Sequence, residues 1–124
     1  MSDQMVHRIW DKSTQTMIRS KGKNSEKNLI PIWMDKEDLR YIGMDYTGKK
    51  DIEGKYIFEG DIVECKFRGK GIVMFKGSCF LLVTLGNWQY VGRLVEPKII
   101  GNMYENPELI PDEMKNKNSL IDFL

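Results

Sequence analysis

Histidine and cysteine are scarce in this sequence. Among 124 residues there is one histidine, His7, and there are two cysteines, Cys65 and Cys79. The cysteines lie in apolar, strand-like runs without CxxC spacing, whereas a zinc site needs several closely spaced thiolate or imidazole ligands. We therefore expect no metal site, and we interpret both cysteines as reduced, buried thiols rather than as disulfide partners.

Long apolar runs are also missing. No stretch approaches the roughly 18 apolar residues that span a bilayer, and the opening residues MSDQMVHRIWDK lack the apolar core of a secretory signal. We expect a protein that does not cross a membrane and stays in the cytoplasm. The 41% hydrophobic and 30% charged residues are typical of a globular protein. The length suits one ordinary domain or two very small ones.

Motifs for covalent or phosphate chemistry are absent. The serines have only His7 as a possible base, and no nucleophile elbow is present. Gly69 and Gly71 flank Lys70, but the serine or threonine, the preceding glycine and the helix of a phosphate-binding loop are missing. A hairpin turn is the better interpretation of these glycines.

Glu59, Gly60 and Asp61 form one pair of carboxylates around a glycine. Such a pair could act as acid and base or hold a cation. No third polar partner is near in sequence, and a Gly-Asp turn that begins a strand explains the same residues. We therefore predict a structural role here, and we expect no catalytic residues, no cofactor and no enzymatic activity.

Net charge is +1, but the charges are unevenly distributed. Residues 64–76 carry four basic side chains against one acidic, residues 19–27 carry the same balance, and residues 105–124 carry five acidic against two basic. We interpret each of these charge clusters as solvated surface. The opposite signs also allow attraction between subunits, or different partners for the two regions.

The first part of the chain predicts a hairpin. Residues 6–20 contain two apolar runs separated by Asp11, Lys12 and Ser13, which favour a turn. A polar loop follows, and residues 31–46 suggest a short helical turn around 35–39 and then a strand to residue 46.

The second half predicts several short strands. In the run 61–67, alternation places Val63, Cys65 and Phe67 on one face. The turn RGKG leads to a second strand, and the nearly continuous apolar run 79–85 favours a strand covered on both faces. Further strands are expected within GNWQYVG, residues 86–92, and at residues 99–101. This spacing predicts a small antiparallel barrel.

Two long motifs carry a resemblance to a known family. The segment YTGKKDIEGKYIFEGDIVE, followed by KIIGNMYENPELI, closely resembles the YopX family of phage and prophage proteins, and the opening HRIWDKSTQTMI is similar to the start of that family. The resemblance spans residues 7–111. It implies a mainly β protein with an SH3-like barrel in its second half, encoded by a phage or prophage, and it implies no activity.

These observations define the expected organisation. We predict a small antiparallel β protein with an N-terminal β-hairpin subdomain at residues 1–46 and a turn-rich connector at 47–55. An SH3-like barrel at 56–111 and a C-terminal extension at 112–124 complete the chain. The apolar residues near the end of the extension favour a short docking segment.

The candidate binding residues are basic and aromatic, namely Lys66, Arg68, Lys70, Trp88 and Tyr90. Trp88 and Tyr90 follow a Gly-Asn turn and are the aromatics that we most expect to be exposed; the others are first of all core residues.

Three functions remain open. The first is a non-enzymatic accessory protein that binds a host or phage protein as a regulator or an inhibitor of host defence. The second is a nucleic-acid-binding barrel, which the basic hairpin and aromatics favour and the net charge of +1 weakens. The third is an oligomer that sequesters a small nucleotide. We also expect a homo-oligomer, because a barrel this small leaves strand edges unpaired.

Overall fold

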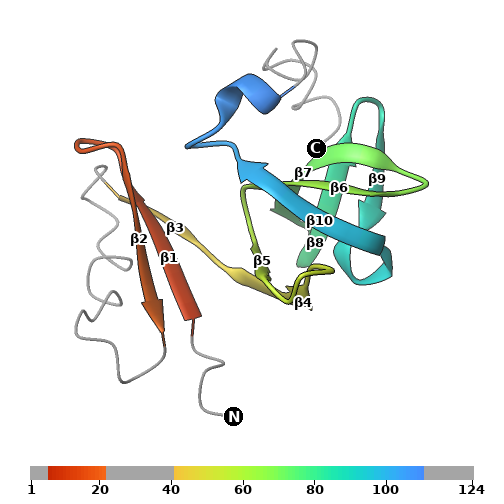
Figure 1. Ribbon diagram of the computed structural model, residues 1–124, viewed down its shortest axis with the longest axis horizontal. Helices are drawn as coiled ribbons and strands as arrows, with labels where there is room; N and C mark the ends of the chain where they lie inside the picture. Colours follow the sequence, from red (N-terminus) through yellow and green to blue (C-terminus); the bar gives the residue numbers. More distant parts are fainter. Residues whose placement is uncertain (1–5, 22–40, 111–124) are drawn as a thin grey trace. The chain divides into compact units, whose positions relative to one another are not determined.

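The computed structural model describes residues 6–21 and 41–110 (Figure 1). The chain divides into two compact units, residues 1–46 and 47–124, which we describe separately. The strand pairs of the three-stranded and five-stranded sheets are antiparallel, and the prediction of a mainly β protein is confirmed. The helical turn expected around 35–39, the extension at 112–124 and most of the polar loop lie outside the described residues.

The first unit contains a three-stranded sheet in the order β2-β1-β3. Its strands are β1 (Val6–Asp11), β2 (Thr16–Lys21) and β3 (Tyr41–Met44). Ile9 and Trp10 on the central strand are buried, and so is Met44. β1 pairs with β2 in an antiparallel ladder, and this pairing confirms the predicted N-terminal hairpin.

The β1–β2 turn is organised by one carboxylate. Asp11 Oδ1 accepts hydrogen bonds from the backbone N–H of Ser13 at 3.0 Å and from the Ser13 hydroxyl at 2.9 Å. Gln15 then takes a left-handed conformation with φ 57°, and its N–H donates to the Asp11 carbonyl at 2.8 Å. Asp and Ser satisfy turn backbone in this way, which is why the sequence signals the turn.

The second unit contains a five-stranded sheet in the order β10-β6-β7-β8-β9 and a two-stranded sheet of β4 and β5. The strands are β4 (Tyr46–Lys50), β5 (Tyr56–Phe58), β6 (Asp61–Lys66), β7 (Gly69–Lys76), β8 (Cys79–Thr84), β9 (Asn87–Tyr90) and β10 (Val95–Asn102). Two short 3₁₀ helices, η3 (Val91–Arg93) and η4 (Pro107–Leu109), follow β9 and β10. The segment 47–55, expected as a turn-rich connector, thus contains most of β4 before its turn.

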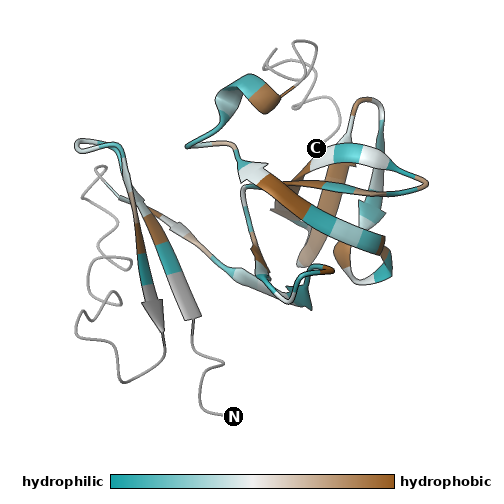
Figure 2. Ribbon diagram, viewed as in Figure 1, coloured by the Kyte–Doolittle hydropathy of each residue, from teal (hydrophilic) through white to brown (hydrophobic). Residues whose placement is uncertain are grey.

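Apolar side chains form two clusters on opposite faces of the five-stranded sheet. The first core consists of Ile57, Val63, Cys65, Val73, Leu82, Val91 and Leu94. The second core consists of Ile62, Ile72, Leu81 and Val83, against which residues of β7, β10 and the segment after β10 pack. Figure 2 shows apolar stretches on β8 and β10. Leu81, Leu82 and Val83 are all buried, which confirms a strand covered on both faces.

The structure corrects the predicted β6–β7 hairpin. Phe67 does not continue the strand: it lies with Arg68 in a two-residue turn, has φ 75° and is 81% exposed. The ladder pairs Cys65 with Gly69, so β7 begins inside the segment that we assigned to the turn. A tight hairpin needs positive φ near its turn, and Gly69 with φ 76° supplies one such position.

Three further expectations need correction or stay open. Cys79 is exposed at the start of β8, whereas Cys65 is buried as expected. Leu85 is also exposed, because β8 ends at Thr84 and Leu85 lies in the following turn. An SH3-like barrel is not confirmed, because no sheet closes on itself within residues 6–21 and 41–110. No helix in these ranges is long and apolar enough to cross a membrane.

Candidate functional site

Trp88 and Tyr90 form an exposed aromatic pair on β9. Their exposed fractions are 42% and 43%, and their rings meet edge to face with centroids 5.1 Å apart. In the β8–β9 ladder, Trp88 lies opposite Val83 and Tyr90 opposite Leu81. Both aromatic side chains therefore lie on the face of the sheet that carries the second core. Their predicted exposure is confirmed.

The backbone of β9 has one edge without a strand partner among the described residues, because β9 is the last strand in the order of its sheet. Thr84 and Asn87 pair across the turn between β8 and β9. In an antiparallel ladder, alternate residues direct N–H and C=O groups toward the partner strand or away from it. Trp88 and Tyr90 accordingly direct these groups outward.

Side chains of β9 itself bind the outward N–H groups. The Trp88 N–H donates to Asn87 Oδ1 at 2.7 Å, and the Tyr90 N–H donates to Gln89 Oε1 at 2.9 Å. These oxygens occupy the positions that the carbonyl groups of a neighbouring strand would take. The edge is thus satisfied locally by exposed or half-exposed amide side chains.

The predicted basic residues lie on the β6–β7 hairpin. Lys66 ends β6, Arg68 lies in the turn and Lys70 belongs to β7, and all three side chains are exposed. Strand alternation places Lys66 and Lys70 on the face that carries the second core, and thus on the face of Trp88. The structure therefore gathers most of the candidate residues on one face, while β8 separates the basic hairpin from the aromatic strand.

The strands between the basic hairpin and β9 carry basic charge, although Glu64 on β6 lies opposite Lys70 on the same face. Residues 65–95 contain five basic side chains and no carboxylate side chain, while the second unit as a whole is nearly balanced. Lys66 Nζ lies 5.4 Å from the centre of the Phe67 ring, within the range of a cation–π contact. Burial raises the pKa of the Cys65 thiol and outweighs the backbone N–H and the charge of Arg68, which act to lower it. Cys65 therefore contributes no negative charge to this region at neutral pH.

Three exposed apolar residues lie at the end of the sheet that carries the basic β6–β7 hairpin, and the sequence did not indicate their exposure. Phe67 and Leu85 lie in the turns at one end of the five-stranded sheet, and Val95 starts β10 opposite Lys66 at the same end. The only sequence signal for them was the pair of glycines, Gly69 and Gly86, which mark those turns.

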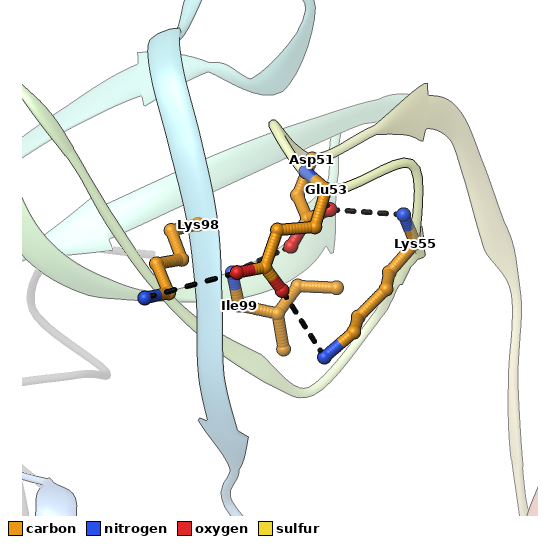
Figure 3. Close-up of polar contacts among 5 residues, drawn as sticks. All are labelled: Asp51, Glu53, Lys55, Lys98 and Ile99. Carbon is orange, nitrogen blue, oxygen red and sulfur yellow. Dashed lines mark hydrogen bonds and ion pairs between the residues drawn. The ribbon is translucent and has the colours of Figure 1, made fainter.

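Asp51 is a second polar centre, between β5 and β10 (Figure 3). Its Oδ1 accepts hydrogen bonds from the backbone N–H of Glu53 and Lys55, each at 2.9 Å, and its Oδ2 accepts one from Ile99 at 3.1 Å. Burial acts to raise the pKa of Asp51, but these hydrogen bonds and the charge of Lys55 outweigh it, so the pKa is lowered. Asp51 is a structural anion that joins the β4–β5 turn to β10.

The Lys98 ammonium lies 3.9 Å from the Glu53 carboxylate, and the Lys55 ammonium lies 3.3 Å from it. These side chains are about half exposed, so the ion pairs contribute little to stability. They line the outside of the Asp51 turn and do not form a reactive group.

Asp61 and Asn102 also bind backbone. Asp61 is completely buried, and its Oδ2 accepts the Phe58 N–H at 2.8 Å. Asn102 Oδ1 accepts the N–H groups of Tyr104 and Glu105, while Asn106 Oδ1 accepts the Asn102 N–H. The two motifs noted in the sequence therefore maintain turns. Within the described ranges no group of His, Cys, Asp and Glu side chains is arranged to bind a metal ion.

The fold and the surface define a small, mainly β protein with an exposed aromatic edge strand and a basic hairpin on one sheet face. Comparison with protein families then places the chain. It belongs to the YopX family, described as YopX protein, which it matches over residues 6–111. Membership of this family indicates a protein of the phage or prophage type.

A solved structure also resembles the chain. The crystal structure of protein EF1440 from Enterococcus faecalis has 20% sequence identity and a TM-score of 0.45, and the similarity covers 85% of this chain and 96% of that one. No curated protein matches the sequence.

Proposed function

We propose that this protein is a non-enzymatic accessory protein of a phage or prophage that binds a host or phage protein and regulates or inhibits it. The observation that carries the proposal is the exposed Trp88–Tyr90 pair on β9. Tyr and Trp are enriched in protein interfaces and dominate their binding energies, since they bury a large area at little cost in conformational entropy.

The arrangement of the carboxylates supports a role without catalysis. Asp51 accepts three backbone N–H groups, and Asp61 is buried and caps the turn before β6. A general acid or base must reach its substrate. Neither of these two carboxylates is placed to do so.

A nucleic-acid-binding function is the second candidate, and one observation favours it. Lys66, Lys70 and the two aromatic residues of β9 lie on one sheet face, and bases stack on aromatic rings beside basic side chains in single-strand binding proteins. Only a few basic residues contribute, however, and the whole chain carries a net charge of +1. Such a surface gives weak, salt-sensitive binding.

Affinity capture tests the proposal. Tagged full-length protein and the variant Trp88→Ala/Tyr90→Ala are used to capture partners from host lysate, each with and without nuclease. We expect a protein that survives nuclease and is lost with the double variant. Phe75→Ala is the matched control, because Phe75 is similarly exposed at 49% but alternates onto the opposite face of β7. A partner that is lost with nuclease supports the nucleic-acid function, and equal capture by all variants contradicts the proposed surface.

A further inference from the structure

The open edge of β9 has the chemical groups of a strand-pairing site. The outward N–H groups of Trp88 and Tyr90 are two residues apart, which is the repeat at which an extended chain presents its own outward groups. They are bound now by the side chains of Asn87 and Gln89, which lie on the surface. An incoming strand can displace both side chains, which then bond to water, so that no N–H group loses its acceptor.

The other outer strand of the sheet differs from β9. On β10, the carbonyl of Pro97 accepts the Ile52 N–H, and the Ile99 N–H donates to Asp51. The turn between β4 and β5 therefore covers that edge. Within residues 41–110, the outward N–H groups of β9 are bound by side chains of neighbouring residues in the same strand, whereas the outer edge of β10 meets the β4–β5 turn.

The charge of the surrounding surface selects the kind of strand. Every charged side chain from residue 65 to residue 95 is basic, and this range includes β7, β8, β9 and η3. An acidic segment is attracted to this region, whereas a basic one is repelled. A second copy of the chain would bring β9 and its equally basic neighbourhood against themselves, so β9–β9 pairing is disfavoured.

We infer that the edge of β9 receives an extended acidic segment of the partner protein as a sixth, added strand. This inference rests on the proposed function and names how the partner is held. Backbone hydrogen bonds to Trp88 and Tyr90 supply affinity, and alternate apolar side chains of the segment pack beside the two rings. The carboxylates of the segment alternate onto the opposite face of the added strand, so they are attracted by the overall basic charge of residues 65–95 and not by direct pairing with Lys66 or Lys70.

A peptide series tests strand addition on the full-length protein. The probe is a synthetic peptide in which glutamate alternates with valine. Its matched control has the same sequence, but every second backbone nitrogen is methylated, so one edge cannot donate hydrogen bonds. A second control replaces glutamate with lysine. Binding is followed by the backbone amide signals of Trp88 and Tyr90 and by their hydrogen exchange.

The acidic peptide is expected to slow exchange of both amides, and methylation is expected to weaken binding at least about tenfold, which corresponds to 1.4 kcal/mol. The lysine peptide is expected to bind more weakly still. In the variant Asn87→Ala/Gln89→Ala, affinity for the acidic peptide should increase, because the competing side chains are gone. If the two substitutions instead damaged the fold, the affinity for the acidic peptide would decrease.

The inference is wrong if the methylated peptide binds as tightly as the unmethylated acidic peptide, or if the acidic peptide does not bind. It is also wrong if oligodeoxythymidine displaces the acidic peptide. Finally, it is wrong if the protein forms a dimer in which the Trp88 and Tyr90 amides are protected from exchange without peptide. If any of these occurs while capture from lysate still depends on Trp88 and Tyr90, strand addition fails and the proposed function stands. If that capture also fails, both are wrong.

Discussion

Replacing Asp51 by asparagine removes one charge from a turn that joins two sheets. The amide oxygen of asparagine can still accept the two hydrogen bonds that Oδ1 accepts now, from the backbone N–H groups of Glu53 and Lys55. At the position of Oδ2, however, the side chain would present an N–H₂ group to the Ile99 N–H, so two donors would face each other.

The size of the effect follows from these contacts. A hydrogen bond to a charged group contributes roughly 1.5–3 kcal/mol, against about 0.5–1.5 kcal/mol for a neutral one. Asp51→Asn loses one bond and weakens two others at a buried position. We therefore expect the second unit to lose about 2–4 kcal/mol of unfolding free energy at neutral pH.

The loss should depend on pH with a defined sign. Because the folded-state pKa of Asp51 is lowered, its carboxylate stabilises the fold above the unfolded-state pKa of about 3.9. This contribution disappears as the pH falls through the folded-state value. The difference in stability between the wild-type protein and the variant should therefore be largest at neutral pH and should shrink below about pH 4.

Urea unfolding, monitored by amide signals of the second unit including Ile99, measures this difference at neutral and acidic pH. Residue-specific signals are needed because the chain has two units. The other carboxylates are common to both proteins, so the comparison isolates Asp51. A difference below about 0.5 kcal/mol at neutral pH, or one that is the same at both pH values, would refute the assigned role.

Three other outcomes are expected. Gly71→Ala should destabilise the second unit by about 1–3 kcal/mol in urea unfolding, because the added Cβ would lie 2.5 Å from the Val83 carbonyl oxygen; an unchanged midpoint contradicts this contact. Labelled single- and double-stranded DNA and RNA should bind only weakly and at low salt, and Arg68→Ala/Lys70→Ala should reduce the log–log salt slope by about one to two; tight binding at physiological salt that collapses in this variant would instead support the nucleic-acid function. Sedimentation at micromolar concentration should give a mass above one 14.5 kDa chain, because the basic residues 64–76 and the acidic residues 105–124 of different subunits attract each other without β9–β9 pairing; a single-chain mass contradicts the expected homo-oligomer.

Local patterns predicted the strands well. The run of apolar residues in β8 indicated burial on both faces, and Leu81, Leu82 and Val83 confirm it, because each face of that strand meets a different core. Alternation failed at Phe67, since its side chain continues the apolar period while its backbone turns. Periodicity reports on side chains and says little about where a backbone with positive φ ends the strand.

The candidate site could be predicted only in part. The Gly86-Asn87 turn indicated exposure of Trp88 and Tyr90, but the open edge of β9 depends on β10 pairing with β6, far away in sequence. The contact from Asp51 to Ile99 spans 48 residues, and no local pattern indicates it. Long-range pairing decides which strand stays at the edge, and single-sequence patterns do not contain that information.

The strand order also determines when the second unit can complete its sheet during synthesis. The hairpins from β6 to β9 join neighbours in sequence and need only short loops to close. Pairing of Ile62 with Gly101 requires nearly forty more residues to leave the ribosome. Until β10 emerges, β6 has an unpaired inner edge, and Ile99 is absent from the first core. A nascent chain that stalls before Val95 therefore exposes a strand that the finished protein covers.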